Sequence, residues 1–158
     1  MNWFRRTLPG IGGLAAACFL LAGPLARAGG ADSVQLAVDV IYADSSNQGV
    51  DAQLAHLRSQ LRTFSYSTYR LLDRHQLNLP VNQPGGRPGH VALPGGRLLV
   101  LIPQGFSGES VVMLTSIQQG GQVLLNSQLK LTNRGTILVG GPVHENGVLI
   151  LAITAIAP

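Results

Sequence analysis

Apolar and polar residues alternate along much of this 158-residue chain. From Val34 to Tyr42 every second side chain is apolar, and the polar residues Gln35 and Asp39 fall between them. The clearest alternation covers residues 122–132, where most odd-numbered positions are apolar and most even-numbered positions are polar. A period of two residues is typical of a half-buried strand. We therefore predict that both segments are β-strands with one face turned toward a core.

One segment has a helical period instead. Four apolar residues recur at intervals of three or four positions: Leu54, Leu57, Leu61 and Phe64. This spacing predicts an amphipathic helix of about three turns. Residues 65–79 mix β-prone and helix-tolerant types, and we predict an extended strand, because the helix would otherwise continue without a stop signal. Prolines and glycines in residues 80–89 predict a loop.

The second half of the chain is predicted to be β throughout. Strands are expected at residues 97–103, 109–118, 122–132, 136–139 and 148–156. Turns are expected at Gly120-Gly121, at 133–135 and at Asn146-Gly147, a strong hairpin signal. The last strand is apolar on both faces, which predicts a central or covered position. The sequence thus predicts a mainly β (α+β) fold, an antiparallel β-sandwich or partly open barrel of roughly seven to eight strands with one packed amphipathic helix.

The first 28 residues have the pattern of a cleavable bacterial export signal. Arg5 and Arg6 precede an apolar run over residues 8–25, and Ala26-Arg27-Ala28 offers a small-x-small cleavage site ending at Ala28. We expect ordinary secretory export, with twin-arginine export as the alternative. The predicted organisation is a signal peptide at 1–28, a flexible leader at 29–33 and a single β-rich domain at 34–158, located in the periplasm or outside the cell.

Removal of this signal changes the charge of the working protein. The chain has 11 basic and 7 acidic residues, and residues 1–28 hold three of the basic ones and none of the acidic ones. Eight basic and seven acidic residues remain, a net charge of +1, which gives no support for nucleic-acid binding. The only cysteine, Cys18, is also removed, so disulfides and thiol chemistry are not expected. Membrane contact is expected only through the transient signal peptide.

Several short motifs together resemble a known family. They are the Asp51, Leu54, Leu57 helix pattern, Phe64 to Leu72, Leu93-Pro94-Gly95-Gly96-Arg97, Leu138 to Pro142 and Gly147 to Ile150. In this order they resemble a family of small exported bacterial proteins without an assigned function. The resemblance covers nearly all of residues 34–155 and implies a single domain. It implies no activity, substrate or site.

Candidate catalytic and metal-binding motifs are weak. The four histidines, His56, His75, His90 and His144, have no partners at metal-ligand spacing. The sequence Gly105-Phe106-Ser107-Gly108 lacks the spacing of a nucleophile elbow and precedes a strand. The aspartates 39, 44 and 51 do not have the spacing of a calcium loop. No catalytic residue, metal or cofactor is therefore predicted.

One aromatic and basic cluster is a candidate for surface recognition. Tyr66, Tyr69 and Arg70 lie close together in the sequence, and tyrosine and arginine are enriched at binding hot spots. The alternative is that the tyrosines are half-buried strand residues whose hydroxyl groups stay in water.

Three functions are compatible with the sequence. We favour an exported, non-catalytic interaction or envelope-accessory module, whose partner is an envelope protein or peptide bound for instance by strand addition. The second is a small outer-membrane β-barrel, which the low aromatic content and the non-aromatic C-terminus disfavour. The third is a hydrolase whose catalytic residues meet only in three dimensions.

Overall fold

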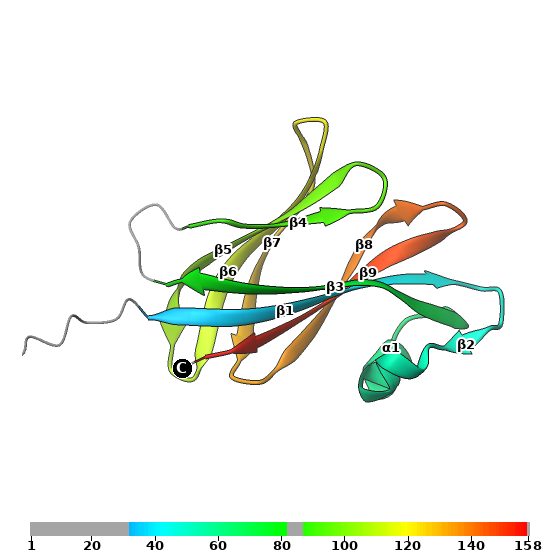
Figure 1. The fold of residues 1–158 in the computed structure, drawn as a ribbon, viewed down its shortest axis with the longest axis horizontal. Helices are drawn as coiled ribbons and strands as arrows, with labels where there is room; N and C mark the ends of the chain where they lie inside the picture. Colours follow the sequence, from blue (N-terminus) through cyan, green and yellow to red (C-terminus); the bar gives the residue numbers. More distant parts are fainter. Residues whose placement is uncertain (1–31, 82–86, 158) are drawn as a thin grey trace, which may run out of the picture.

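The computed structural model describes residues 32–81 and 87–157 (Figure 1). The predicted signal peptide at 1–28, most of the predicted leader at 29–33 and the middle of the predicted 80–89 loop lie outside these residues. The strands are β1 Ser33–Asp44, β2 Gly49–Val50, β3 Thr68–Pro80, β4 Gly89–Leu93, β5 Arg97–Ser107, β6 Ser110–Gln119, β7 Gln122–Thr132, β8 Thr136–His144 and β9 Gly147–Ile156. A 3-10 helix, η1 Ala52–Leu57, continues into the α-helix α1 Arg58–Leu61.

The strands form two sheets. The five-stranded sheet has the order β2-β3-β1-β9-β8, and the four-stranded sheet has the order β4-β5-β6-β7. Neighbouring strands are antiparallel, except for the short β2, which pairs in parallel with the start of β3. The prediction of a mainly β sandwich or partly open barrel with one helical segment is thereby confirmed. The described residues hold nine strands rather than seven or eight, because the two-residue β2 carries too little sequence pattern to be predicted.

Strand β1 shows why the alternating pattern was informative. The alternating residues Val34, Val38 and Val40 are buried in the main core, as predicted. Ile41 and Ala43 on the opposite face are buried as well, so the prediction of a half-buried strand holds only for the first part of β1. It pairs with β3 on one side and with β9 on the other, where Val38 lies opposite Ile153. Strand β9 is central in its sheet, between β1 and β8, as its apolar residues on both faces predicted.

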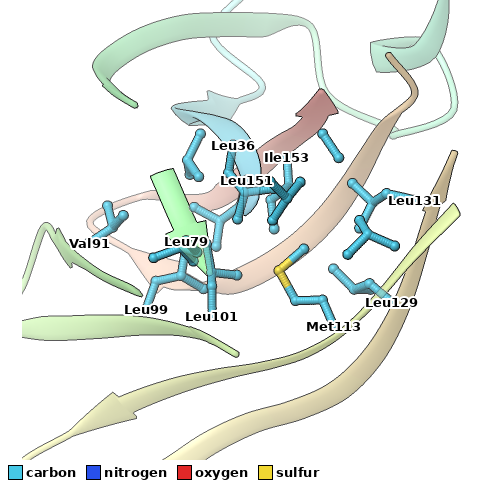
Figure 2. Packing of buried hydrophobic residues seen from close by; sticks show 14 of the residues in the cluster. Leu36, Leu79, Val91, Leu99, Leu101, Met113, Leu129, Leu131, Leu151 and Ile153 are labelled. Carbon is cyan, nitrogen blue, oxygen red and sulfur yellow. The ribbon is translucent and has the colours of Figure 1, made fainter. Parts of the chain in front are cut away.

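The main hydrophobic core fills the space between the two sheets. Figure 2 shows leucines and valines of both sheets converging there, with the thioether of Met113 among them. Leu36 and Leu151 enter from the five-stranded sheet, and Leu99 enters from the four-stranded sheet. Full burial of such a side chain stabilises the fold by about 1.5–3 kcal/mol.

A second, smaller core lies on the outer face of the five-stranded sheet. There the helical segment packs three buried leucines, Leu54, Leu57 and Leu61, against Ile41 and Ile150. The side chain of Asp51 accepts a hydrogen bond of 2.9 Å from the backbone N–H of Gln53 and so caps the segment. The single helix predicted for this segment is thus a 3-10 helix followed by one short α-helical stretch. Phe64 lies beyond the helix end and still contacts the same core.

Two strands extend further than the sequence predicted. Strand β5 continues to Ser107 through an irregularity after Pro103, and β8 continues to His144 through one after Gly140. Irregularities of this kind let a strand continue past residues that interrupt regular pairing. Glycine is favoured at 141, because a Cβ there would make a tight contact of 3.0 Å with the carbonyl oxygen of Leu149.

Candidate functional site

Strand β7 forms an open edge of the four-stranded sheet. It pairs with β6 along one side, and no strand within residues 32–81 and 87–157 pairs with its other side. The turn after it is tied to β9, because the backbone N–H of Arg134 donates to the carbonyl oxygen of Ala155 at 2.7 Å. Most of the strand lies beyond this tie, toward the β6–β7 hairpin, which extends to the top of the view in Figure 1.

The other sheet edges carry features that block the addition of a further strand. Strand β4 has only five residues, and Pro94 follows it. Strand β8 contains Pro142, which has no N–H to donate. Strand β3 is partly covered by β2 and carries charged side chains, including Asp73 and Arg74. Short length, proline and charge are the features by which natural proteins prevent edge-to-edge association.

The first seven residues of β7 have none of these features. Residues 122–128 read Gln-Val-Leu-Leu-Asn-Ser-Gln, without a charge, a proline or a glycine. The first charge in the strand is Lys130. By the same criterion, this is the least protected sheet edge in the part of the chain that the structure describes. We call residues 122–128 the β7 edge.

A bulge places an apolar side chain in solvent on this edge. Ile117 of β6 lies opposite Leu125, whereas the next residue, Gln118, lies opposite Val123, so Leu124 is an extra residue without a partner. Val123 and Leu124 are 59% and 46% exposed. Bulges occur preferentially at sheet edges, where they redirect side chains. Here the result is two adjacent exposed hydrophobic side chains.

The outer face of the sheet continues this apolar surface. Leu114 of β6 is 38% exposed, and it lines a shallow hollow of about 230 Å³ together with Val100, Ile102 and Val123. A partner bound along the β7 edge would therefore find side-chain contacts on the adjoining face as well as backbone hydrogen-bond groups.

The structure separates the three residues predicted for surface recognition. Tyr69 is only 4% exposed, and its hydroxyl donates to the carbonyl oxygens of Leu61 and Phe64. Arg70, the next residue in the strand, does not line the hollow that Tyr66 and Tyr69 share. Its guanidinium lies 5.0 Å from the ring centre of Tyr42 instead. Tyr66 is half-buried and lines a hollow with Tyr69. Burial raises the pKa of the Tyr69 hydroxyl above its usual value.

Three of the four histidines lie near a carboxylate oxygen. The Nε2 atom of His75 is 3.0 Å from an oxygen of Asp73, in an orientation that makes no hydrogen bond. His56 and His144 have carboxylate oxygens at 4.0 Å and 3.9 Å, from Asp39 and Glu145. Among the described residues no hydrogen bond joins a histidine to a serine, threonine or tyrosine hydroxyl, and no group of three or more ligating side chains is arranged to hold a metal.

Asp39 is the most deeply placed of these carboxylates. Its two oxygens accept hydrogen bonds from Nε and Nη2 of Arg74 at 2.6 Å and 2.9 Å. The hydrogen bond from Arg74 to Asp39 raises the pKa of the Arg74 guanidinium. This bidentate pair is a cross-strand contact between β1 and β3, in which Asp39 lies opposite Arg74.

The β7 edge was not predicted from the alternating pattern of residues 122–132, although its uncharged Val-Leu-Leu run was a usable signal.

In the portion that the structure describes, no helix has the length and apolar character needed to cross a bilayer. Comparison with protein-family models, with curated proteins and with solved structures finds no match to this chain.

Proposed function

We propose that this chain is an exported, non-catalytic interaction module that binds an extended segment of an envelope protein or peptide along the β7 edge. The observation that carries the proposal is the contrast among the sheet edges. Among the sheet edges of the described residues, 122–128 form the longest stretch without charge or proline, since on β8 such a stretch ends at Gly141, before Pro142, and β4 has only five residues. A natural protein that leaves such an edge unprotected risks aggregation unless the edge has a partner.

Strand addition would use the backbone groups that β6 leaves free. An incoming segment adds one strand to the sheet, and its backbone hydrogen bonds supply affinity, while pockets for alternate side chains supply specificity. Val123, Leu124 and Leu114 are exposed at this position and offer apolar contacts. The expected partner therefore is an extended segment with apolar side chains, bound without chemical change.

The proposal of export rests on residues 1–28. Their arginine pair, apolar run and Ala26-Arg27-Ala28 site are the features of a secretory signal. In that location the partner would be an extended segment of an envelope protein or peptide, the form that strand addition requires.

The test compares two leucine-to-lysine variants in pull-downs from envelope extract. Leu124→Lys places a charge on the β7 edge. Leu72→Lys is the matched control, because Leu72 is also an extra residue at a register shift, in β3, and is 42% exposed compared with 46% for Leu124. We expect the wild-type chain and Leu72→Lys to retain the same specific proteins and Leu124→Lys to lose them, since edge lysines block strand addition.

Two results would count against the proposal. Retention by Leu124→Lys of everything that the wild-type chain retains would remove the β7 edge from binding. Equal loss in both variants would point to a general effect of the added charge. Gel filtration of the same three proteins identifies a second copy of the chain as the partner if only Leu124→Lys shifts to a smaller species.

A further inference from the structure

A hollow beside the helical segment combines positive charge with aromatic surface. It lies where α1 and the following turn face β2 and the start of β3, at the end of the molecule opposite the four-stranded sheet (Figure 1). Its volume is about 320 Å³, at the small end of the range for ligand pockets. Its lining includes two arginines and three aromatic residues: Arg58, Arg62, Phe64, Tyr66 and Tyr69. We call this feature the Arg58–Arg62 hollow.

The two arginines are like charges on one face of the helix. Residues four positions apart in a helix are neighbours, and like charges at this spacing repel. No carboxylate within the described ranges lies close enough to either guanidinium to form an ion pair. The acidic residues that flank the preceding loop are used locally, since Asp44 accepts hydrogen bonds from Ser46 and Asp51 accepts one from Gln53.

The aromatic side of the hollow is held in place by hydrogen bonds. The Tyr69 hydroxyl donates to the carbonyl oxygen of Leu61 at 2.9 Å and to that of Phe64 at 3.1 Å. These bonds fix the turn that leads from the helix to β3. Phe64 and Tyr66 are half-buried within that turn, and both line the hollow. The hollow therefore exists before any ligand arrives, which lowers the entropic cost of binding.

We propose that the Arg58–Arg62 hollow binds a small carboxylic acid with an apolar body. A guanidinium presents N–H donors in a planar fork that matches a carboxylate, and a bound carboxylate would offset the repulsion between Arg58 and Arg62. The Phe64 and Tyr66 rings would cover the apolar body of the acid. This site is separate from the β7 edge, and neither depends on the other.

The test is an NMR titration of the isotope-labelled full chain with three probes. They are 3-phenylpropionate, its neutral amide 3-phenylpropanamide, and acetate, which has the carboxylate without the apolar body. We expect saturable shifts of the Arg58 and Arg62 side-chain N–H signals and of the Tyr66 amide with 3-phenylpropionate. The amide and acetate should each bind roughly tenfold more weakly, because each lacks one of the two contacts.

Charge variants complete the test. Arg58→Gln and Arg62→Gln should each weaken 3-phenylpropionate binding roughly tenfold. Arg87→Gln removes the same charge from an exposed position before β4, and it should leave binding unchanged. The Leu124→Lys variant should also bind normally, which separates this proposal from that for the β7 edge. Equal binding of the acid and the amide, absence of saturable shifts, or equal weakening by Arg87→Gln would overturn the proposal.

Discussion

The hydroxyl of Tyr69 donates a hydrogen bond of 2.9 Å to the carbonyl oxygen of Leu61. Tyr69 is the second residue of β3, and Leu61 is the last residue of α1. The bond therefore joins the end of the helical segment to the sheet that it covers. Carbonyl groups at a helix end have no partner within the helix, so a buried tyrosine hydroxyl is a fitting donor for them.

Tyr69→Phe is expected to lower the free energy of unfolding by about 1–2 kcal/mol. The carbonyl oxygen of Phe64 loses this donor, and that of Leu61 keeps only the backbone N–H of Phe64. Urea denaturation at neutral pH measures this. Tyr66→Phe is the matched control, since the Tyr66 hydroxyl donates neither of these two hydrogen bonds. A Tyr69→Phe protein as stable as the wild type would show that this bond contributes nothing.

The same residue predicts a loss of stability in alkali. Burial raises the pKa of Tyr69 in the folded protein, whereas in the unfolded chain it is about 10. Between these two values the unfolded chain has released the proton and the folded protein has kept it, so stability falls as pH rises. Below the unfolded pKa the contribution is fully present. We expect wild-type stability to decline above about pH 10 more steeply than that of Tyr69→Phe, as measured by urea denaturation across this range.

Gly147 at the start of β9 is predicted to tolerate no side chain. A Cβ there would collide with the carbonyl oxygen of Ala43 and would lie 3.0 Å from ring atoms of Tyr42. Gly147→Ala should therefore lower the free energy of unfolding by about 1–3 kcal/mol. Gly140→Ala is the control, since its Cβ would meet only Phe64, at an ordinary 3.8 Å. Thermal unfolding of the two variants followed by circular dichroism gives the comparison, and equal melting temperatures would contradict the close approach of β1 and β9 at Gly147.

Cleavage after Ala28 is the prediction that concerns export. Mass spectrometry of the protein secreted or released from a bacterial host should find a chain that begins at Gly29. Replacement of Ala26 and Ala28 by leucine should block processing, because the cleavage site needs small residues. A released protein that retains residues 1–28 would refute the signal-peptide interpretation.

The sequence predicted which face of a strand enters the core better than it predicted which strands pair with each other. Alternation in residues 34–42 identified the face of β1 that enters the main core, although it did not reveal that Ile41 on the other face is buried too. The Asn146-Gly147 signal located the β8–β9 hairpin. Side-chain period depends on local geometry alone, so it is visible in one sequence. Which strands pair depends on contacts between distant segments, so the assignment of each strand to one of the two sheets was not predictable from these patterns.

The candidate site was less predictable than the fold for the same reason. The β7 edge is defined by the absence of a neighbouring strand, and absence of a neighbour leaves no periodic signal in residues 122–128. Tyr66, Tyr69 and Arg70 were grouped because they are close in the sequence, but β3 begins among them and consecutive strand residues face opposite sides. Tyr69 is consequently buried, while Arg70 is exposed near Tyr42.

The most direct test of the account is site-specific photo-cross-linking in the envelope of living cells. A benzophenone amino acid at position 124 probes the β7 edge, and the same residue at position 72 probes a comparably exposed bulge in β3. Strand addition at β7 predicts a discrete adduct from position 124 and none from position 72. Adducts of equal yield from both positions, or from position 72 alone, would contradict the assignment of recognition to the β7 edge.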